Sequence, residues 1–91
     1  MIPVIITTGF RGVFFGDIEE EHEGRETVRV HNVRNAIYWK GCRGFLGLAS
    51  HGPEKGSTIG STAPEVLLHK VTSVARCTDV AAKVWREWPE A

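Results

Sequence analysis

An excess of charge of either sign is missing from this chain. Its 91 residues include 11 lysines and arginines against 11 aspartates and glutamates, so the formal net charge is zero. Proteins that coat duplex nucleic acid carry a positive excess, because neutralising phosphates supplies much of their affinity. The balance therefore argues against duplex nucleic acid as a partner. It also leaves little repulsion between copies of the chain, and we expect a homo-oligomer.

Cysteine is scarce, and long apolar runs are lacking. The two cysteines are Cys42 and Cys77. The opening residues MIPVIITTGF have neither the basic segment nor the cleavage site of a secretory signal, so we expect two reduced thiols rather than a disulfide. No apolar run approaches the ~18–20 residues that a membrane-spanning helix needs. These absences predict a cytoplasmic protein with no membrane partner.

Signatures of catalysis and of metal binding are also missing. The sequence has no GxSxG nucleophile motif, and no serine or cysteine with a recognisable base partner. Its four histidines and two cysteines match no zinc-binding spacing. We therefore predict a protein that is not an enzyme and that holds no metal and no cofactor.

What the sequence does contain is a set of short strand-like runs within one domain, residues 1–91. Residues 36–39 form either a further short strand or a continuation of the strand-like run 27–33. Gly16 is typical of a bulge or a sharp bend, and a bend is also expected near His69 and Lys70. β-branched and alternating apolar residues predict strands over 3–8, 13–20, 27–33 and 65–76.

Two helices complete the predicted fold. Residues 43–50 suit one or two helical turns, and a longer helix starts at an N-cap, Thr78 or Asp79, and stops before Pro89. Strands and helices in this order predict an α+β fold with a short middle helix and a C-terminal helix. The strands would form a small curved antiparallel sheet of about four or five members, barrel-like in one version.

The apolar face of the C-terminal helix is predicted from its spacing. Val80, Val84 and Trp88 recur at i, i+4 and i+8, whereas Trp85 lies one position off that stripe. The stripe is expected to pack in the core or against a second subunit. Trp88, close to the end of the helix, is a candidate dimer contact.

The segment with most capacity for binding is the glycine-rich loop 52–62. Consecutive backbone N–H groups in such a loop can converge on one anion, with Lys55 supplying charge and Ser57 and Thr58 supplying hydroxyl groups. It is not a P-loop, because its lysine precedes the glycine of the GxxxxGK[ST] pattern. The alternative is a plain surface connection.

Aromatic and basic residues stand close together just before that loop. Tyr38 and Trp39 are flanked by the cations Arg34, Lys40 and Arg43. On a strand the two ring side chains leave on opposite faces. We expect one ring to enter the core and the other to lie nearer the surface, where it could stack on a nucleobase. The alternative is that both rings fill the core or an oligomer interface.

Two further segments are candidates for binding. Arg11, between two glycines at a tight turn, is either solvated or able to approach a ligand closely. The acidic run 19–26 is best explained as a solvated hairpin tip that turns at Gly24. A carboxylate-rich tip of this kind could also imitate the phosphates of nucleic acid.

Several motifs of the chain resemble a known family. The sequence contains GVFFG, a charged hairpin, VRVHNVRNAIYW, RGFLGLASHGPEKGSTIG and VTSVARCTDVAAKVW. Together these resemble a family of small phage and prophage proteins, the DUF6948 type, over about residues 4–88. The resemblance implies a phage accessory protein that works in the bacterial host cytoplasm. It assigns no catalytic residues.

We therefore expect a non-catalytic phage protein with an anti-defence role. In the first hypothesis it captures a small anionic, nucleotide-like ligand, such as a host immune signal. In the alternative it inhibits a host defence protein through an acidic face made of Asp17, Glu19, Glu20, Glu21 and Glu23. A cryptic enzyme is a third option. The ligand-binding residues of the first hypothesis are Arg11, Arg34, Arg43 and Lys55 for phosphate, Ser57 and Thr58 for hydrogen bonds, and Tyr38 or Trp39 for stacking.

Overall fold

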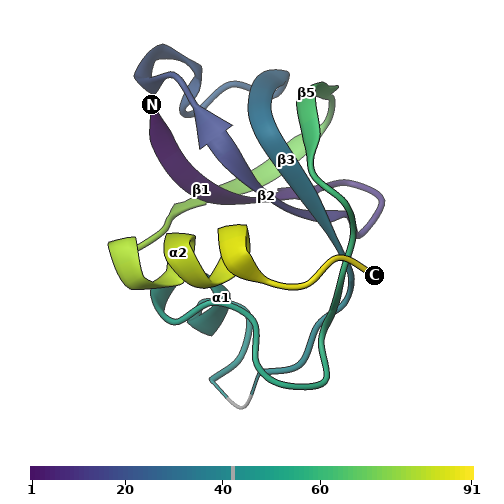
Figure 1. The fold of residues 1–91 in the computed structure, drawn as a ribbon. Coiled ribbons are helices and arrows are strands. Elements are labelled where there is room, and N and C mark those ends of the chain that lie inside the picture. Colours follow the sequence, from purple (N-terminus) through teal and green to yellow (C-terminus); the bar gives the residue numbers. More distant parts are fainter. Residues whose placement is uncertain (42) are drawn as a thin grey trace.

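An antiparallel sheet of six strands forms the body of the molecule in the computed structural model, which describes residues 1–41 and 43–91 (Figure 1). The fold is α+β, as the sequence predicted, with one short and one longer α-helix beside the sheet. The strands are β1 (Ile2–Thr8), β2 (Val13–Ile18), β3 (Val28–Tyr38), β4 (Thr58–Ile59), β5 (Ala63–Leu68) and β6 (Val71–Arg76). The helical elements are the 3-10 turn η1 (Glu20–His22), α1 (Gly47–Ser50) and α2 (Asp79–Glu87).

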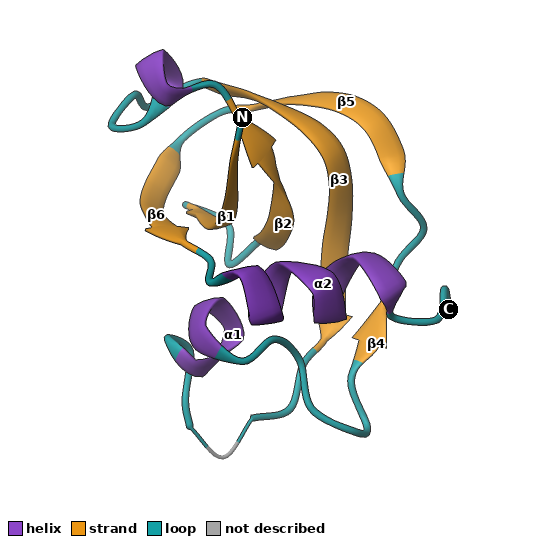
Figure 2. Cartoon of the chain, turned by 60° about the vertical axis from the view of Figure 1, so that its left-hand side comes forward, coloured by secondary structure: helices purple, strands orange, loops and turns teal. Residues whose placement is uncertain are grey.

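The strand order is β4-β3-β2-β1-β6, and β5 also pairs with β3. The long strand β3 runs without a break through residues 36–38, so it continues rather than starting a new strand. The same strand pairs with β5 over its first half and with β4 near Tyr38. Figure 2 shows how strongly the strands curve. Across the described strands no pairing joins β5 to β6, so the sheet is open and the barrel-like version of the prediction is wrong.

The predicted single strand 65–76 is two strands on different parts of the sheet. Lys70 adopts a positive φ of 56° and reverses the chain between them. The next residue, Val71, donates its N–H to the Glu26 carbonyl oxygen, and β6 then pairs with β1. The bend expected near His69 and Lys70 is thus a complete turn.

The alternation of β-strand side chains divides the apolar residues between two clusters. On β1, Val4 and Ile6 belong to a cluster among the strands, whereas Ile5 belongs to a second cluster with residues of α1 and α2. In Figure 2 both α-helices lie together beside the sheet. The second cluster consists of Ile5, Phe15, Leu48, Ala49, Ile59, Ala82 and Trp85.

Gly16 is needed at the irregularity in β2. The register between β2 and β3 shifts between Phe15 and Asp17, which agrees with the bulge predicted there. A Cβ atom on Gly16 would lie 2.3 Å from Cγ1 of Val30 on the neighbouring strand. Close approach of the two strands therefore requires glycine.

The C-terminal helix begins as predicted but buries a different face. Thr78 is its N-cap and accepts a hydrogen bond from the Ala81 N–H at 3.1 Å. Its buried residues include Ala82 and Trp85, whereas Val80 is 66% exposed. Val80 therefore lies outside the core of the single chain, and packing of the predicted stripe against a second subunit stays a prediction. Tertiary packing of one large ring overrides the regular spacing.

The cysteine prediction can be compared with the structure at one of its two positions. Cys77 is a free, half-buried thiol, and burial raises its pKa to about 12. The prediction for Cys42 falls outside the described residues. Among the described helices, none has the length and apolar character needed to cross a bilayer.

Candidate functional site

The loops at the end of the molecule that carries α1 and β4 form a concave surface. Lys40, Gly41, Glu54 and Lys55 line a hollow of about 430 Å³, which we call the loop concavity. The Glu54 N–H donates to the Lys40 carbonyl oxygen at 3.1 Å, and the Lys40 N–H donates to Ser57 Oγ at 2.9 Å. These bonds tie the two loop segments together and bring the two lysines to one hollow.

Three predicted residues from the glycine-rich loop lie at or near the loop concavity. Lys55 lines it. Ser57 uses its hydroxyl group on the Lys40 backbone, so this side chain closes the loop. Thr58 lies in β4, where it pairs with Tyr38 of β3. The loop prediction for residues 52–62 missed this short strand, because a two-residue strand has no periodicity of its own.

The two neighbouring rings divide between surface and core, as their alternation predicted. Tyr38 is 56% exposed at the end of β3. Trp39 is half-buried, packs against the helix-side cluster and contacts Phe45 edge-on with ring centroids 6.4 Å apart. Of the two predicted stacking residues, Tyr38 is therefore the one with a ring available to a ligand.

Two predicted cations are exposed but do not line the loop concavity. Arg43 lies on the approach to α1. Arg11 has a φ of 63° in the turn between β1 and β2. Gly9 of the same turn donates its N–H to the Lys70 carbonyl oxygen. Arg11 therefore lies beside the turn between β5 and β6 and not beside the glycine-rich loop.

Arg34, the fourth predicted phosphate-binding cation, lies under the end of α2. The residue is 2% exposed. Its Nε donates to the Gly60 carbonyl oxygen at 2.9 Å, and its Nη1 donates to the carbonyl oxygens of Trp85, at 2.8 Å, and Trp88. A cation at the carbonyl end of a helix is favourable, because it satisfies the unpaired carbonyl groups and opposes the negative end of the dipole. Arg34 thus joins β3 to α2 and does not line the loop concavity.

Two opposing effects act on the pKa of the Arg34 guanidinium. Burial lowers the pKa of its guanidinium from the usual value, and attraction by the Glu90 carboxylate opposes that shift. An arginine keeps its charge in proteins even under such a shift. The molecule therefore carries a buried positive charge beneath α2.

A second arginine in the same region was missed by the sequence analysis. Arg86 of α2 makes a two-pronged ion pair with Asp17 of β2, at 2.7 and 2.9 Å, and its guanidinium lies 5.2 Å from the centroid of the Phe15 ring. This pairing lowers the pKa of the Asp17 carboxyl group. The available signal was strand alternation, because Asp17 shares a face of β2 with buried Phe15 and could not belong to a solvated acidic tip.

Two of the five carboxylates that the alternative hypothesis requires are paired with arginines. Asp17 is paired with Arg86, and Glu23 binds Arg76 through two hydrogen bonds of 2.7 and 2.8 Å. The other three carboxylates, Glu19, Glu20 and Glu21, are exposed. An inhibitor surface at this tip would therefore depend on three glutamates rather than five.

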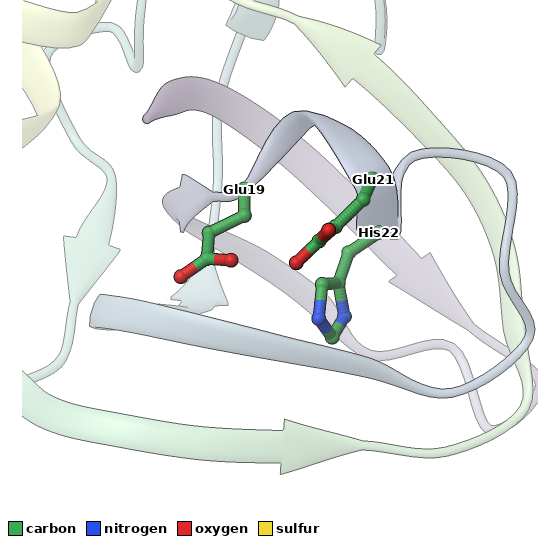
Figure 3. A group of neighbouring side chains, drawn as sticks. All are labelled: Glu19, Glu21 and His22. Carbon is green, nitrogen blue, oxygen red and sulfur yellow. The ribbon is translucent and has the colours of Figure 1, made fainter.

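The tip also contains a cluster with metal-ligating atoms. Glu19, Glu21 and His22 place one ligand atom each within 4.8 Å of one another, and Figure 3 shows their side chains on one side of η1. The two carboxylates are exposed, and the His22 Nδ1 also accepts from the Arg29 N–H at 3.4 Å. Exposed acidic clusters are common without any bound cation, so this cluster alone assigns no function.

Comparison with known proteins gives the family of this chain. The family described as "Domain of unknown function (DUF6948)" matches residues 1–85, nearly the whole sequence, and the chain belongs to that family. No curated protein and no solved structure matches the chain.

Proposed function

We propose that this DUF6948 protein is a non-catalytic binding protein that captures a small anionic, nucleotide-like ligand at the loop concavity. The observation that carries the proposal is the pair Lys40 and Lys55 on one hollow of about 430 Å³. Ligand pockets for small molecules typically have volumes of ~300–1,000 Å³. The hollow is thus of a size for a mononucleotide or a related ligand.

The residues around the loop concavity suit a ligand with one charged and one aromatic part. Lys40 and Lys55 neutralise phosphate, and Glu54 on the same hollow limits the net charge to a single positive unit. The exposed ring of Tyr38 lies two residues before Lys40 and offers a face for a base to stack on. A ligand with few phosphates matches this balance better than a polyphosphate.

The biological setting is part of the same proposal. The resemblance of the sequence to phage and prophage proteins supports an accessory protein that acts in the bacterial host cytoplasm. Capture of a nucleotide-derived immune signal would there suppress a host defence. A homo-oligomer is also proposed, since exposed apolar side chains such as Ile37, Leu46 and Val80 could be covered between copies.

Binding to a panel of cyclic nucleotides and ADP-ribose tests the proposal, measured by calorimetry and native mass spectrometry. We expect saturable binding of at least one of these ligands, weakened at least about tenfold in a Lys40→Ala/Lys55→Ala variant, since two charge-assisted contacts are lost. Tyr38→Ala should also weaken binding. The control is Lys83→Ala, an exposed lysine on α2. Absence of binding across the panel, or equal weakening in the control, would contradict the proposal.

A second candidate function rests on the exposed run of glutamates at η1. We propose, as the alternative, that this run inhibits a host defence nuclease by imitating nucleic-acid phosphates. Changing Glu19, Glu20 and Glu21 to lysine should abolish such inhibition in a nuclease assay and leave nucleotide capture unchanged. Inhibition that survives the charge reversal would exclude this alternative.

A further inference from the structure

The turn between β1 and β2 and the turn between β5 and β6 together form an exposed surface. The Gly9 N–H donates to the Lys70 carbonyl oxygen at 2.9 Å, which joins the two turns. Phe10 is 80% exposed, and the Lys70 Nζ lies 4.9 Å from the centroid of its ring. We call this the turn surface; it consists of Gly9, Phe10, Arg11 and Lys70.

The two cations of the turn surface have no carboxylate partner. Arg11 and Lys70 are both exposed. No ion pair in the described part of the chain includes either of them, whereas Arg29, Arg76 and Arg86 each bind a carboxylate. The guanidinium and ammonium groups are therefore accessible and available to an anion that comes from outside the chain.

Both cations also occupy strained backbone positions. Arg11 has a φ of 63° and Lys70 a φ of 56°. A left-handed conformation is unfavourable for a residue with a Cβ atom, and strain of this kind is typical of functional positions. Glycine adopts such a φ without strain, so the backbone of the two turns gives no reason for a long cationic side chain at either position.

A hollow of about 400 Å³ lies along the outer edge of β6, beside the turn surface. It begins at Val71, the residue after Lys70, and its outer wall is the segment of residues 23–25. On that wall Arg25 is exposed, and it belongs to none of the ion pairs between described residues. We call this the edge hollow; it is formed by residues 71–74 and 23–25.

The edge hollow also offers unpaired backbone groups. The Cys77 N–H donates to the Pro3 carbonyl oxygen, so the hydrogen-bonded positions of β6 fall at every second residue from Cys77. Val74 lies at one of the other positions, and its N–H and C=O groups point away from β1. Among the described strands, β6 pairs with β1 alone. These backbone groups of Val74 are therefore free to bond to a ligand in the edge hollow.

The net charge of the two neighbouring features is positive but small. Glu23, on the wall of the edge hollow, is balanced by Arg76. Glu26 adds one negative charge close by, since its carbonyl oxygen accepts the Val71 N–H. Against it stand three cations without carboxylate partners: Arg11, Arg25 and Lys70. This balance suits a flexible partner with a few separate negative charges.

From these observations we propose that the turn surface and the edge hollow bind single-stranded nucleic acid. One base stacks on the open face of the Phe10 ring, and Arg11 and Lys70 bind the adjoining phosphates. The next nucleotide enters the edge hollow, whose volume is within the usual range for ligand pockets, and there meets Arg25 and the Val74 backbone.

Other anionic partners match this geometry less well. The bases of a duplex are covered by their neighbours, so they cannot stack on Phe10. An anionic membrane would have to accept the Lys70 ammonium together with the ring that it contacts, and a charge is costly inside a bilayer. The proposed site is separate from the loop concavity and does not depend on the nucleotide-like ligand proposed there.

Fluorescence anisotropy of a labelled oligothymidylate of about eight nucleotides tests this proposal. We expect saturable binding at low salt. The logarithm of the affinity should fall with the logarithm of the salt concentration with a slope of about −2, because each phosphate contact with a single strand contributes about −0.7. An oligomer of the same length without bases should bind at least about fivefold more weakly, because it cannot stack.

Matched variants locate the strand on the molecule. Phe10→Ala should weaken binding of oligothymidylate at least about fivefold and leave binding of the abasic oligomer unchanged. Arg11→Gly/Lys70→Gly should weaken binding at least about tenfold and move the salt slope to about −0.7. Its urea midpoint should not fall, because glycine suits both backbone conformations. The controls Lys83→Ala and Lys40→Ala/Lys55→Ala should bind as the unmodified chain does.

Each other outcome overturns the proposal. It fails if oligothymidylate does not bind saturably, or if the abasic oligomer binds equally well. Competition by polyglutamate as strong as that by unlabelled oligothymidylate would show a surface for acidic peptides instead. Loss of binding in Lys40→Ala/Lys55→Ala would place the strand at the loop concavity. Failure of the mononucleotide panel with intact binding of oligothymidylate at the turn surface would contradict the proposed function alone.

Discussion

Replacing Trp85 with alanine is the most direct test of how α2 lies on the sheet. Trp85 has no exposed surface and stacks on Phe15, with ring centroids 5.4 Å apart and planes 3° from parallel. Its Nε1 donates to the Leu48 carbonyl oxygen at 3.0 Å, which joins α2 to α1. This one side chain therefore connects both helices to the sheet.

The size of the effect follows from these contacts. Truncating a buried tryptophan to alanine lowers the free energy of unfolding by about 3–5 kcal/mol. The unsatisfied Leu48 carbonyl oxygen adds about 1 kcal/mol. A domain of this length has a total stability of roughly 5–14 kcal/mol at about 0.05–0.15 kcal/mol per residue. Trp85→Ala should thus lose roughly 30% or more of the free energy of unfolding. Exposed Val80→Ala should change that free energy by less than about 0.5 kcal/mol.

Urea denaturation followed by circular dichroism measures both variants. If Trp85→Ala does not fold, Trp85→Phe supplies the value, because it keeps most of the packing and loses the hydrogen bond, at a cost of about 1–2 kcal/mol. The reasoning is refuted if Val80→Ala lowers the free energy of unfolding more than the Trp85 variants do. That result would mean that the face predicted from the spacing of Val80 and Val84 is the buried one.

Two further predictions concern an ion pair and a glycine. Because Arg86 lowers the pKa of Asp17, the pair adds stability that is present above the ordinary aspartate pKa and is lost as the pH falls through the lowered value. Asp17→Asn should remove this acid-dependent step from urea midpoints measured against pH. Gly52 has a φ of 86°, and a Cβ atom there would lie 2.8 Å from the Val84 Cβ. Gly52→Ala should therefore lower the free energy of unfolding, measured in urea, by about 2 kcal/mol or more. Gly24 has a similar positive φ but no atom within 4 Å of such a Cβ, so Gly24→Ala should lower it by about 1 kcal/mol.

The parts of the fold that the sequence predicted are those set by local physics. β-branched and apolar runs located β1 and β2, and alternation located the first half of β3. The side-chain chemistry of Thr78 located the start of α2. Gly16 marked the bulge, because only glycine allows β2 and β3 to approach there. These features depend on neighbours within a few residues or on one strand pair.

The parts that the sequence could not predict depend on partners far along the chain. Arg34 was interpreted as a phosphate-binding cation, yet the carbonyl groups that it binds belong to residues 51 and 54 positions later. Lys40 was noted only as a neighbour of the two rings. It joins Lys55 because the backbone bonds of Glu54 and Ser57 fold the loop back, and no spacing in the sequence encodes that contact.

The loop concavity depends on α2 through Trp88, and this dependence can be measured without any ligand. The Trp88 Nε1 donates to the Ser57 carbonyl oxygen at 3.3 Å, and the hydroxyl of the same Ser57 accepts the Lys40 N–H. Trp88→Phe removes the indole donor and keeps a ring in place. Loss of a bond worth about 1 kcal/mol should speed hydrogen exchange at the Lys40 amide about fivefold, while Lys83→Ala leaves it unchanged. Unaltered protection of Lys40 in Trp88→Phe would show that the loop holds its two lysines together without the helix.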